Sequence, residues 1–171
     1  MTRQPESPTG INHLVLNVRD LERAHHFWTE CLGFHHVGSW ERPRPDGQQP
    51  ARMRFYSGVQ EGKLRHHDIA LLEQSEMPEN LTLHPQVLNH VAVTYASAES
   101  WQRQIQYLMA KGIVPFRQIK RGATCSAHLL DPDGNEIELV YEFPRSVWEG
   151  DINAALNHAV VQPVGSHAVD S

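Results

Sequence analysis

The sequence predicts an α+β fold built from two tandem modules, each with the order strand–helix–strand–strand–strand. The main observation is an internal repeat, because the segment at residues 12–17 recurs in the second half of the chain at residues 89–94. Both segments alternate and are rich in branched aliphatic residues, which is typical of a β-strand. Each is followed by an amphipathic stretch that ends at a glycine, the pattern of a capped helix.

The first module begins with a strand whose Leu14 and Leu16 share one face, so His13 points to the other face. Asp20 is a good N-cap for the helix that follows, and Gly33 suits its end. The apolar face of this helix is expected to contain Leu21, Ala24, Trp28 and Cys31.

The second module repeats this order. Val91 and Val93 share one face of its first strand, which leaves His90 on the other. Ser97 is the expected N-cap of the second helix, and Gly112 its end. The apolar face of this helix is expected to contain Trp101, Ile105, Leu108 and Met109.

Strand-like segments follow each helix, at residues 53–56 and 65–72 in the first module and at 123–130 and 136–141 in the second. Residues 131–135, Asp-Pro-Asp-Gly-Asn, predict a tight turn between the last two strands. The modules are therefore expected at about residues 10–73 and 87–142, within one domain at 10–142. Residues 143–171 form a C-terminal extension, in which we expect one helix at 147–158.

The composition excludes several classes of protein. The chain has 171 residues, of which 40% are hydrophobic, and a net charge of -5, so a nucleic acid or an anionic membrane is a poor partner. No apolar run approaches the roughly 20 residues of a membrane span, and the polar residues 1–10 do not resemble a signal peptide. Two cysteines are too few for a disulfide framework. We expect a cytoplasmic protein.

Histidine is enriched, with 12 residues that include adjacent pairs at 25–26, 35–36 and 66–67. One inward-facing histidine on a strand is usually a core residue. His13 and His90, however, stand at matching repeat positions, and two modules related by a pseudo-two-fold axis would bring them to the same cavity. Glu138 adds a carboxylate that is costly to bury without a cation or a hydrogen-bonding partner, although an exposed strand residue is the alternative. Two imidazoles and one carboxylate are typical of a non-haem Fe(II) centre.

The two histidine strands, the Cys-Leu-Gly-Phe segment at residues 31–34 and the turn-plus-glutamate run at 131–139 resemble the glyoxalase/bleomycin-resistance/extradiol-dioxygenase (vicinal oxygen chelate) superfamily. The resemblance covers about residues 10–142. It implies a curved mixed sheet around a metal-binding cavity, with His13, His90 and Glu138 as metal ligands. Fe(II) is the expected metal, with Mn(II) or another divalent ion as the alternative. The fold hosts several chemistries, so the resemblance is less specific for an activity.

The segment at residues 65–71 is similar to the part of extradiol catechol dioxygenases that ends in an acid/base histidine beside the metal. His67, immediately before Asp68, matches that histidine, and His66 is expected to point the other way. In glyoxalase-type relatives the corresponding strand more often supplies a Glu or Gln as a ligand or base. The remaining alternative is a surface pair of histidines near a loop.

One position departs from the ring-cleaving families, which place a tyrosine ten residues before the metal-binding glutamate and a further histidine nine residues earlier. This sequence has His128 and Ile119 there. Because imidazole can donate a hydrogen bond, we expect His128 to act as the catalytic donor in place of the tyrosine, or else to mark a different reaction.

The resemblance thus implies an Fe(II)-dependent extradiol dioxygenase that cleaves a catechol-type aromatic diol with O2. The alternative is a metal-dependent glyoxalase-like isomerase, lyase or thiol transferase of the same superfamily. A non-catalytic ligand-binding protein is a third class, against which the intact His13, His90 and Glu138 set argues. We also expect a homodimer.

Overall fold

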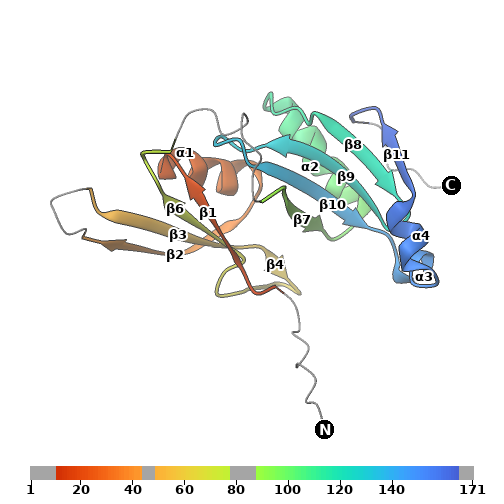
Figure 1. Cartoon of the computed structure of the whole chain (residues 1–171), viewed down its shortest axis with the longest axis horizontal. Coiled ribbons are helices and arrows are strands. Elements are labelled where there is room, and N and C mark those ends of the chain that lie inside the picture. The colour runs from red at the N-terminus through yellow and green to blue at the C-terminus, as the bar shows by residue number, and fades with distance from the viewer. Residues whose placement is uncertain (1–10, 44–48, 78–87, 166–171) are drawn as a thin grey trace, which may run out of the picture. The chain divides into compact units, whose positions relative to one another are not determined.

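The computed structural model describes residues 11–43, 49–77 and 88–165 (Figure 1). Two compact units are distinguished by their internal contacts, Met1–Pro78 and Glu79–Ser171. The boundary between them falls between the two predicted modules.

The first unit contains a four-stranded sheet in the order β1-β6-β3-β2, in which β1 is parallel to β6 and the other neighbours are antiparallel. Its main elements are β1 (Leu14–Val18), α1 (Leu21–His26), the π-helical turn η1 (Phe27–Cys31), β2 (His35–Arg42), β3 (Ala51–Ser57) and β6 (Ile69–Glu73). A small hairpin of β4 (Val59–Gln60) and β5 (Lys63–Leu64) is inserted between β3 and β6.

The second unit repeats this topology. Its elements are β7 (Val91–Tyr95), α2 (Ala98–Ala110), β8 (Arg117–Arg121), β9 (Thr124–Leu130) and β10 (Glu136–Glu142). The sheet order β7-β10-β9-β8 matches β1-β6-β3-β2 strand for strand. The first and last strands of the module along the chain, β7 and β10, are again parallel neighbours. This correspondence confirms the predicted α+β fold with two tandem βαβββ modules.

The C-terminal extension differs from its prediction. In place of one helix at residues 147–158, it forms α3 (Arg145–Trp148), α4 (Ile152–Asn157) and a strand, β11 (Ala159–Gln162), that pairs with the edge of β8. The helix is interrupted at Gly150, a poor helix former. Asp151 then starts a new helix, because its side chain accepts a hydrogen bond from the Ala154 amide at 2.9 Å.

The predicted helix caps are confirmed. The Asp20 carboxylate accepts hydrogen bonds from the backbone amides of Glu22 and Arg23 at the start of α1. Ser97 and Ser100 form a reciprocal capping box at the start of α2. Gly33 and Gly112 both have φ +79°, the left-handed conformation that ends a helix most easily at glycine.

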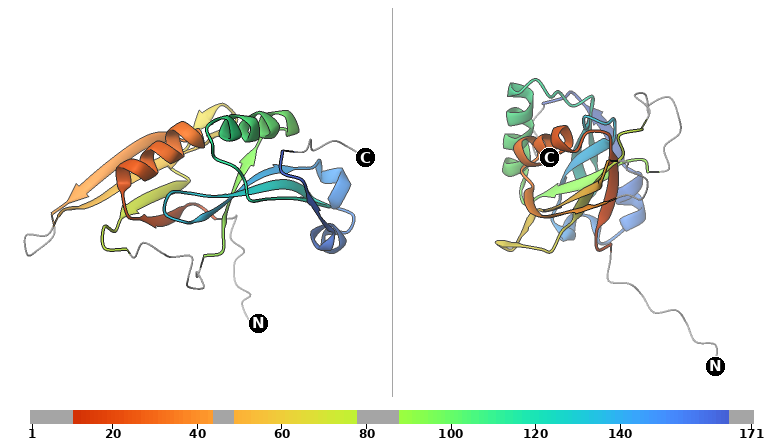
Figure 2. Two further views of the ribbon diagram at one scale, coloured as in Figure 1. Left: turned by 90° about the horizontal axis from the view of Figure 1, so that it is seen from above. Right: turned by 90° about the vertical axis from the view of Figure 1, so that its left-hand side faces the viewer.

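Each helix lies against one face of its own sheet (Figure 2). The buried residues include those predicted for both helices, with Trp28 and Trp101 almost completely enclosed. The Trp101 indole also donates a hydrogen bond to the Leu139 carbonyl at 2.8 Å, which fixes α2 against β10. Met109 is the exception, because 39% of it is exposed. It follows Leu108 directly and so lies about 100° further round the helix, at the edge of the buried face.

In the part of the chain that the structure describes, no helix is long and apolar enough to cross a membrane.

Candidate metal centre

Three histidines come together at one end of the first sheet. The imidazole centres of His13 and His67 lie 4.3 Å apart, those of His66 and His67 lie 4.6 Å apart, and His13 and His66 are separated by 6.4 Å. The parallel pairing of β1 with β6 explains this arrangement. Its first hydrogen bond joins the Leu14 amide to the Asp68 carbonyl at 3.0 Å. The residues just before both strands are therefore neighbours.

The prediction that His66 points away from His67 is wrong. Nδ1 of His66 lies 2.8 Å from Nδ1 of His67. Side chains alternate between faces only within an extended strand, and β6 begins at Ile69, after both histidines. The two rings are therefore free to turn toward each other.

Asp68 fixes the backbone that carries His67. Its carboxylate accepts hydrogen bonds from the Gly58 amide at 2.9 Å and from the Arg65 guanidinium at 2.8 Å. The Ser57 hydroxyl approaches the same carboxylate at 3.3 Å. These contacts join the two ends of the insertion that contains β4 and β5, so they hold the segment just before β6 in place.

His67 is half-buried and packs edge-on against Phe55, with ring centres 5.0 Å apart. Burial lowers the pKa of His67, and the neighbouring imidazoles of His13 and His66 lower it further. A neutral imidazole is thereby favoured near pH 7, and a neutral imidazole is the form that accepts a proton.

The second unit brings His90 and Glu138 together. Nε2 of His90 lies 3.1 Å from Oε2 of Glu138, whose side chain is only 13% exposed. Glu138 stands beside Ala92 in the parallel pairing of β10 with β7, and β7 begins one residue after His90. Two donor atoms that each lie about 2.1 Å from one metal ion, at a right angle, are separated by roughly 3 Å. The spacing observed here suits such a pair.

His128 joins this group from β9, directly opposite Glu138 in the antiparallel ladder. It is 3% exposed, and its Nε2 lies 3.5 Å from Oε1 of Glu138. On its other side, Nδ1 lies 2.7 Å from Oε1 of Glu136, which also accepts a hydrogen bond from Arg117 at 2.9 Å. Burial lowers the pKa of His128 despite the opposing effect of Glu136.

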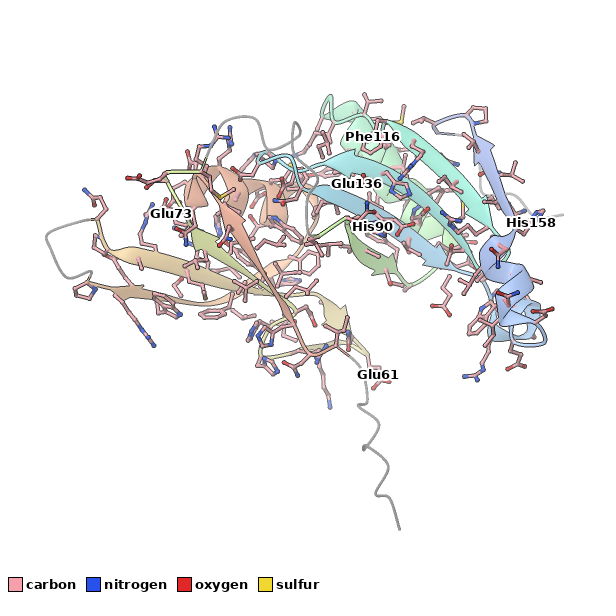
Figure 3. All side chains as sticks on the ribbon, in the orientation of Figure 1. Glu61, Glu73, His90, Phe116, Glu136 and His158 are labelled. Carbon is pink, nitrogen blue, oxygen red and sulfur yellow. The ribbon has the colours of Figure 1, made fainter. Side chains whose placement is uncertain are left out.

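Sequence reasoning did not identify the roles of Glu136 and Arg117. Figure 3 shows Glu136 and His90 on the same part of the second unit. The residue two positions before Glu138 must share its face of the strand, which is the signal that would have placed Glu136 beside His128. Arg117 has no such signal, because its position depends on the pairing of β8 with β9.

The two repeated histidines have the same supporting contact. Nδ1 of His13 lies 2.8 Å from Oδ1 of Asn12, and Nδ1 of His90 lies 2.6 Å from Oδ1 of Asn89. An amide oxygen only accepts, so each Nδ1 carries a hydrogen, and in the neutral ring Nε2 then has the lone pair that a metal would take. Metal-binding histidines are typically oriented by an outer contact of this kind. The chemistry of these donor atoms therefore fits a divalent metal.

The predicted ligands are divided between the units, with His13 in the first and His90 and Glu138 in the second. Among the described residues, no three histidine, cysteine, aspartate or glutamate side chains converge closely enough to hold a metal ion. The full ligand set accordingly stays a prediction.

Paired βαβββ modules with a histidine at the start of each first strand define the class of protein, and comparison with known proteins gives the family. Residues 10–139 match the model of the glyoxalase/bleomycin resistance protein/dioxygenase superfamily. The chain belongs to this superfamily, whose members include dioxygenases, glyoxalases and fosfomycin resistance enzymes.

Among curated proteins, the chain is similar to biphenyl-2,3-diol 1,2-dioxygenase 2 of Rhodococcus globerulus, with 34% identity over 74 residues. This match spans 43% of the chain and 39% of the relative, so it covers less than half of either protein.

Solved structures show the same fold. A glyoxalase/bleomycin resistance protein/dioxygenase domain from Frankia sp. EAN1pec has a TM-score of 0.60 and 20% identity, over 80% of this chain and 94% of that one. The fosfomycin resistance protein FosX of Listeria monocytogenes, solved with Mn(II) and sulfate, has a TM-score of 0.53 and 17% identity, over 79% and 93%.

Proposed function

We propose that the protein is an Fe(II)-dependent extradiol dioxygenase that cleaves the ring of a catechol-type aromatic diol with O2. The observation that carries the proposal is the repeated asparagine–histidine pair, which orients the rings of His13 and His90 through Nδ1, so that Nε2 is the nitrogen for a metal. The partly buried carboxylate of Glu138 beside His90 completes two nitrogen ligands and one oxygen ligand.

In this proposal His13, His90 and Glu138 hold the metal. Bound there, Fe(II) would supply a Lewis acid with about three remaining coordination positions, enough for both oxygens of a diol and for O2. Mn(II) is the alternative metal, although two imidazole ligands suit Fe(II) better.

His67 is the proposed acid/base. Its lowered pKa favours a neutral ring near pH 7, so it can accept a proton from a hydroxyl of the diol and later return it. His13 lies beside it, with ring centres 4.3 Å apart. A metal ligand and the acid/base are thus neighbours in the first unit.

His128 is proposed to position the substrate by donating a hydrogen bond, in place of the tyrosine common in ring-cleaving relatives. Its Nδ1 is tied to Glu136, which fixes the ring so that Nε2 lies toward Glu138. The neutral ring that the lowered pKa favours donates from Nε2 in the tautomer whose Nδ1 accepts from Arg117, at 3.2 Å. In this role His128 orients one hydroxyl next to the metal ligands.

The partial similarity to a biphenyl-2,3-diol dioxygenase supports a diol substrate. The test is anaerobic reconstitution with Fe(II), followed by a panel of catechols in an oxygen electrode. We expect oxygen uptake together with a yellow ring-opened product. Glu138→Gln should abolish both, whereas Glu142→Gln, an exposed residue on the same strand, should leave them unchanged.

Absence of oxygen uptake by iron-loaded protein with every catechol would reject the dioxygenase and favour the glyoxalase-like isomerase, lyase or transferase. Failure of the protein to retain any divalent metal would instead favour a ligand-binding protein.

A further inference from the structure

A second group of imidazoles lies on the other face of the first sheet. His25, in the last turn of α1, and His36, on β2, both approach the ring of Tyr56 on β3. The neighbouring Phe55 contacts His67, and consecutive strand residues point to opposite faces. The group formed by His25, His36 and Tyr56 is therefore separate from the proposed iron site, and its role does not depend on the proposed function.

The spacing of the two rings suits one metal ion. The ring centres of His25 and His36 lie 5.4 Å apart. Imidazole nitrogens bind Zn²⁺ at about 2.0–2.1 Å, which puts the centres of two rings on one tetrahedral ion at roughly 5 Å from each other.

Each ring is held through one nitrogen, which leaves the other available. Nδ1 of His25 lies 3.0 Å from the Tyr56 hydroxyl, and Nε2 of His36 lies 2.8 Å from the Ser39 hydroxyl. A hydroxyl oxygen accepts from a ring N–H, so the remaining nitrogens, Nε2 of His25 and Nδ1 of His36, can carry free lone pairs. Outer contacts of this kind are typical of metal-binding histidines.

Two backbone irregularities occur at this group. The helix changes from α to π immediately after His26, at Phe27–Cys31, and β2 contains a bulge between His36 and Gly38. π-turns are frequent at functional sites, and bulges redirect side chains. The bulge falls where β2 passes Tyr56, so it contributes to the direction of the His36 ring.

We propose that His25 and His36 form a second metal site, which binds a divalent transition-metal cation of the Zn²⁺ class with water as the remaining ligands. Imidazole suits Zn²⁺, Cu²⁺ and Ni²⁺ better than it suits Mg²⁺ or Ca²⁺. Two protein ligands make this an open site.

The surrounding charges are compatible with a cation. Arg54 lies near the Tyr56 phenol, but its guanidinium is neutralised by Glu22 through two hydrogen bonds of 3.0 and 2.5 Å. Burial lowers the pKa of His25, with further contributions from Arg54 and His36, so the ring is neutral near pH 7. Burial also raises the pKa of Tyr56 to about 12, so its hydroxyl stays un-ionised as a contact for His25.

The test is calorimetric titration of Zn²⁺ into the full chain and its variants at neutral pH. His25→Ala and His36→Ala should each lose one class of Zn²⁺ sites. His26→Ala and His35→Ala are matched controls, because they remove the exposed sequence neighbour of each ligand, and they should keep it. Identical Zn²⁺ binding by all four variants would overturn the proposal, as would equal losses in all four.

Tyr56→Phe provides a test that keeps both ligands. It removes only the oxygen beside His25 and should weaken this class of Zn²⁺ sites by roughly 10–100-fold, the usual effect of losing an outer contact. Nitrogen-15 NMR of the imidazoles should show Zn²⁺-dependent shifts at His25 and His36. Unchanged signals from these rings at saturating Zn²⁺ would contradict the site.

Discussion

Removal of the amide that supports His90 should weaken iron binding without touching a ligand. Asn89→Leu keeps a side chain of similar size but removes the oxygen that lies 2.6 Å from Nδ1 of His90. Loss of an outer contact typically costs 10–100-fold in metal affinity. Asn89 and His90 are both exposed, so water can replace part of the lost hydrogen bond. We therefore expect a weakening of about tenfold, near 1.4 kcal/mol.

The repeat provides an internal check on this value. Asn12→Leu removes the corresponding contact of His13, at 2.8 Å, and should have a similar effect. Because the two asparagines support different ligands, their effects should add, so the double variant should bind Fe(II) about 100-fold more weakly. The assay is anaerobic competition for Fe(II) with a coloured chelator. Asn153→Leu, an exposed asparagine on α4, is the control. Wild-type affinity in both single variants would refute the reasoning.

Three further predictions concern catalysis, stability and assembly. His67→Phe should retain iron and bind catechol, but ring cleavage should fall by roughly 10²–10⁴; loss of iron would make His67 a ligand, and full activity would remove it from the mechanism. Because burial raises the pKa of Tyr56 from 10.0 to about 12, its contribution to stability is complete below pH 10 and is lost as the pH rises through 12. The unfolding free energy should fall by roughly 3 kcal/mol over this range. In denaturant titrations at several pH values, Tyr56→Phe should reduce this fall, and an unchanged pH dependence would contradict the prediction. Finally, we expect a homodimer by sedimentation at micromolar concentration, and a monomer alone would reject this expectation.

Local signals in the sequence were sufficient to predict the repeat and the helices. Asp20 and Ser97 cap as expected, and the paired glycines end both helices. The sequence did not locate β2, β8 or β11. The segments His35–Arg42 and Arg117–Arg121 are rich in charged and polar residues, so they lack the apolar alternation that identifies a strand. They become strands because their backbones form hydrogen bonds with β3 and β9, which local sequence does not reveal.

The site was predicted in part. Alternation and the repeat predict that Glu138 and His90 face the cavity, and the two side chains lie 3.1 Å apart, but their role as metal ligands stays a prediction. The contact of Glu136 with His128 and Arg117 was missed, because it links three strands through their register rather than through spacing along the chain. The direction of His66 was wrong because the residues before β6 do not follow strand geometry.

The proposed iron site takes its ligands from both repeats. The direct measurement is the iron content of the anaerobically reconstituted chain after removal of unbound metal, for the wild type, His13→Ala and Glu138→Ala. Circular dichroism should first confirm that each variant is folded. We predict one Fe(II) per wild-type chain and loss of most of it in both variants. Wild-type iron content in both folded variants would contradict the proposed ligand set.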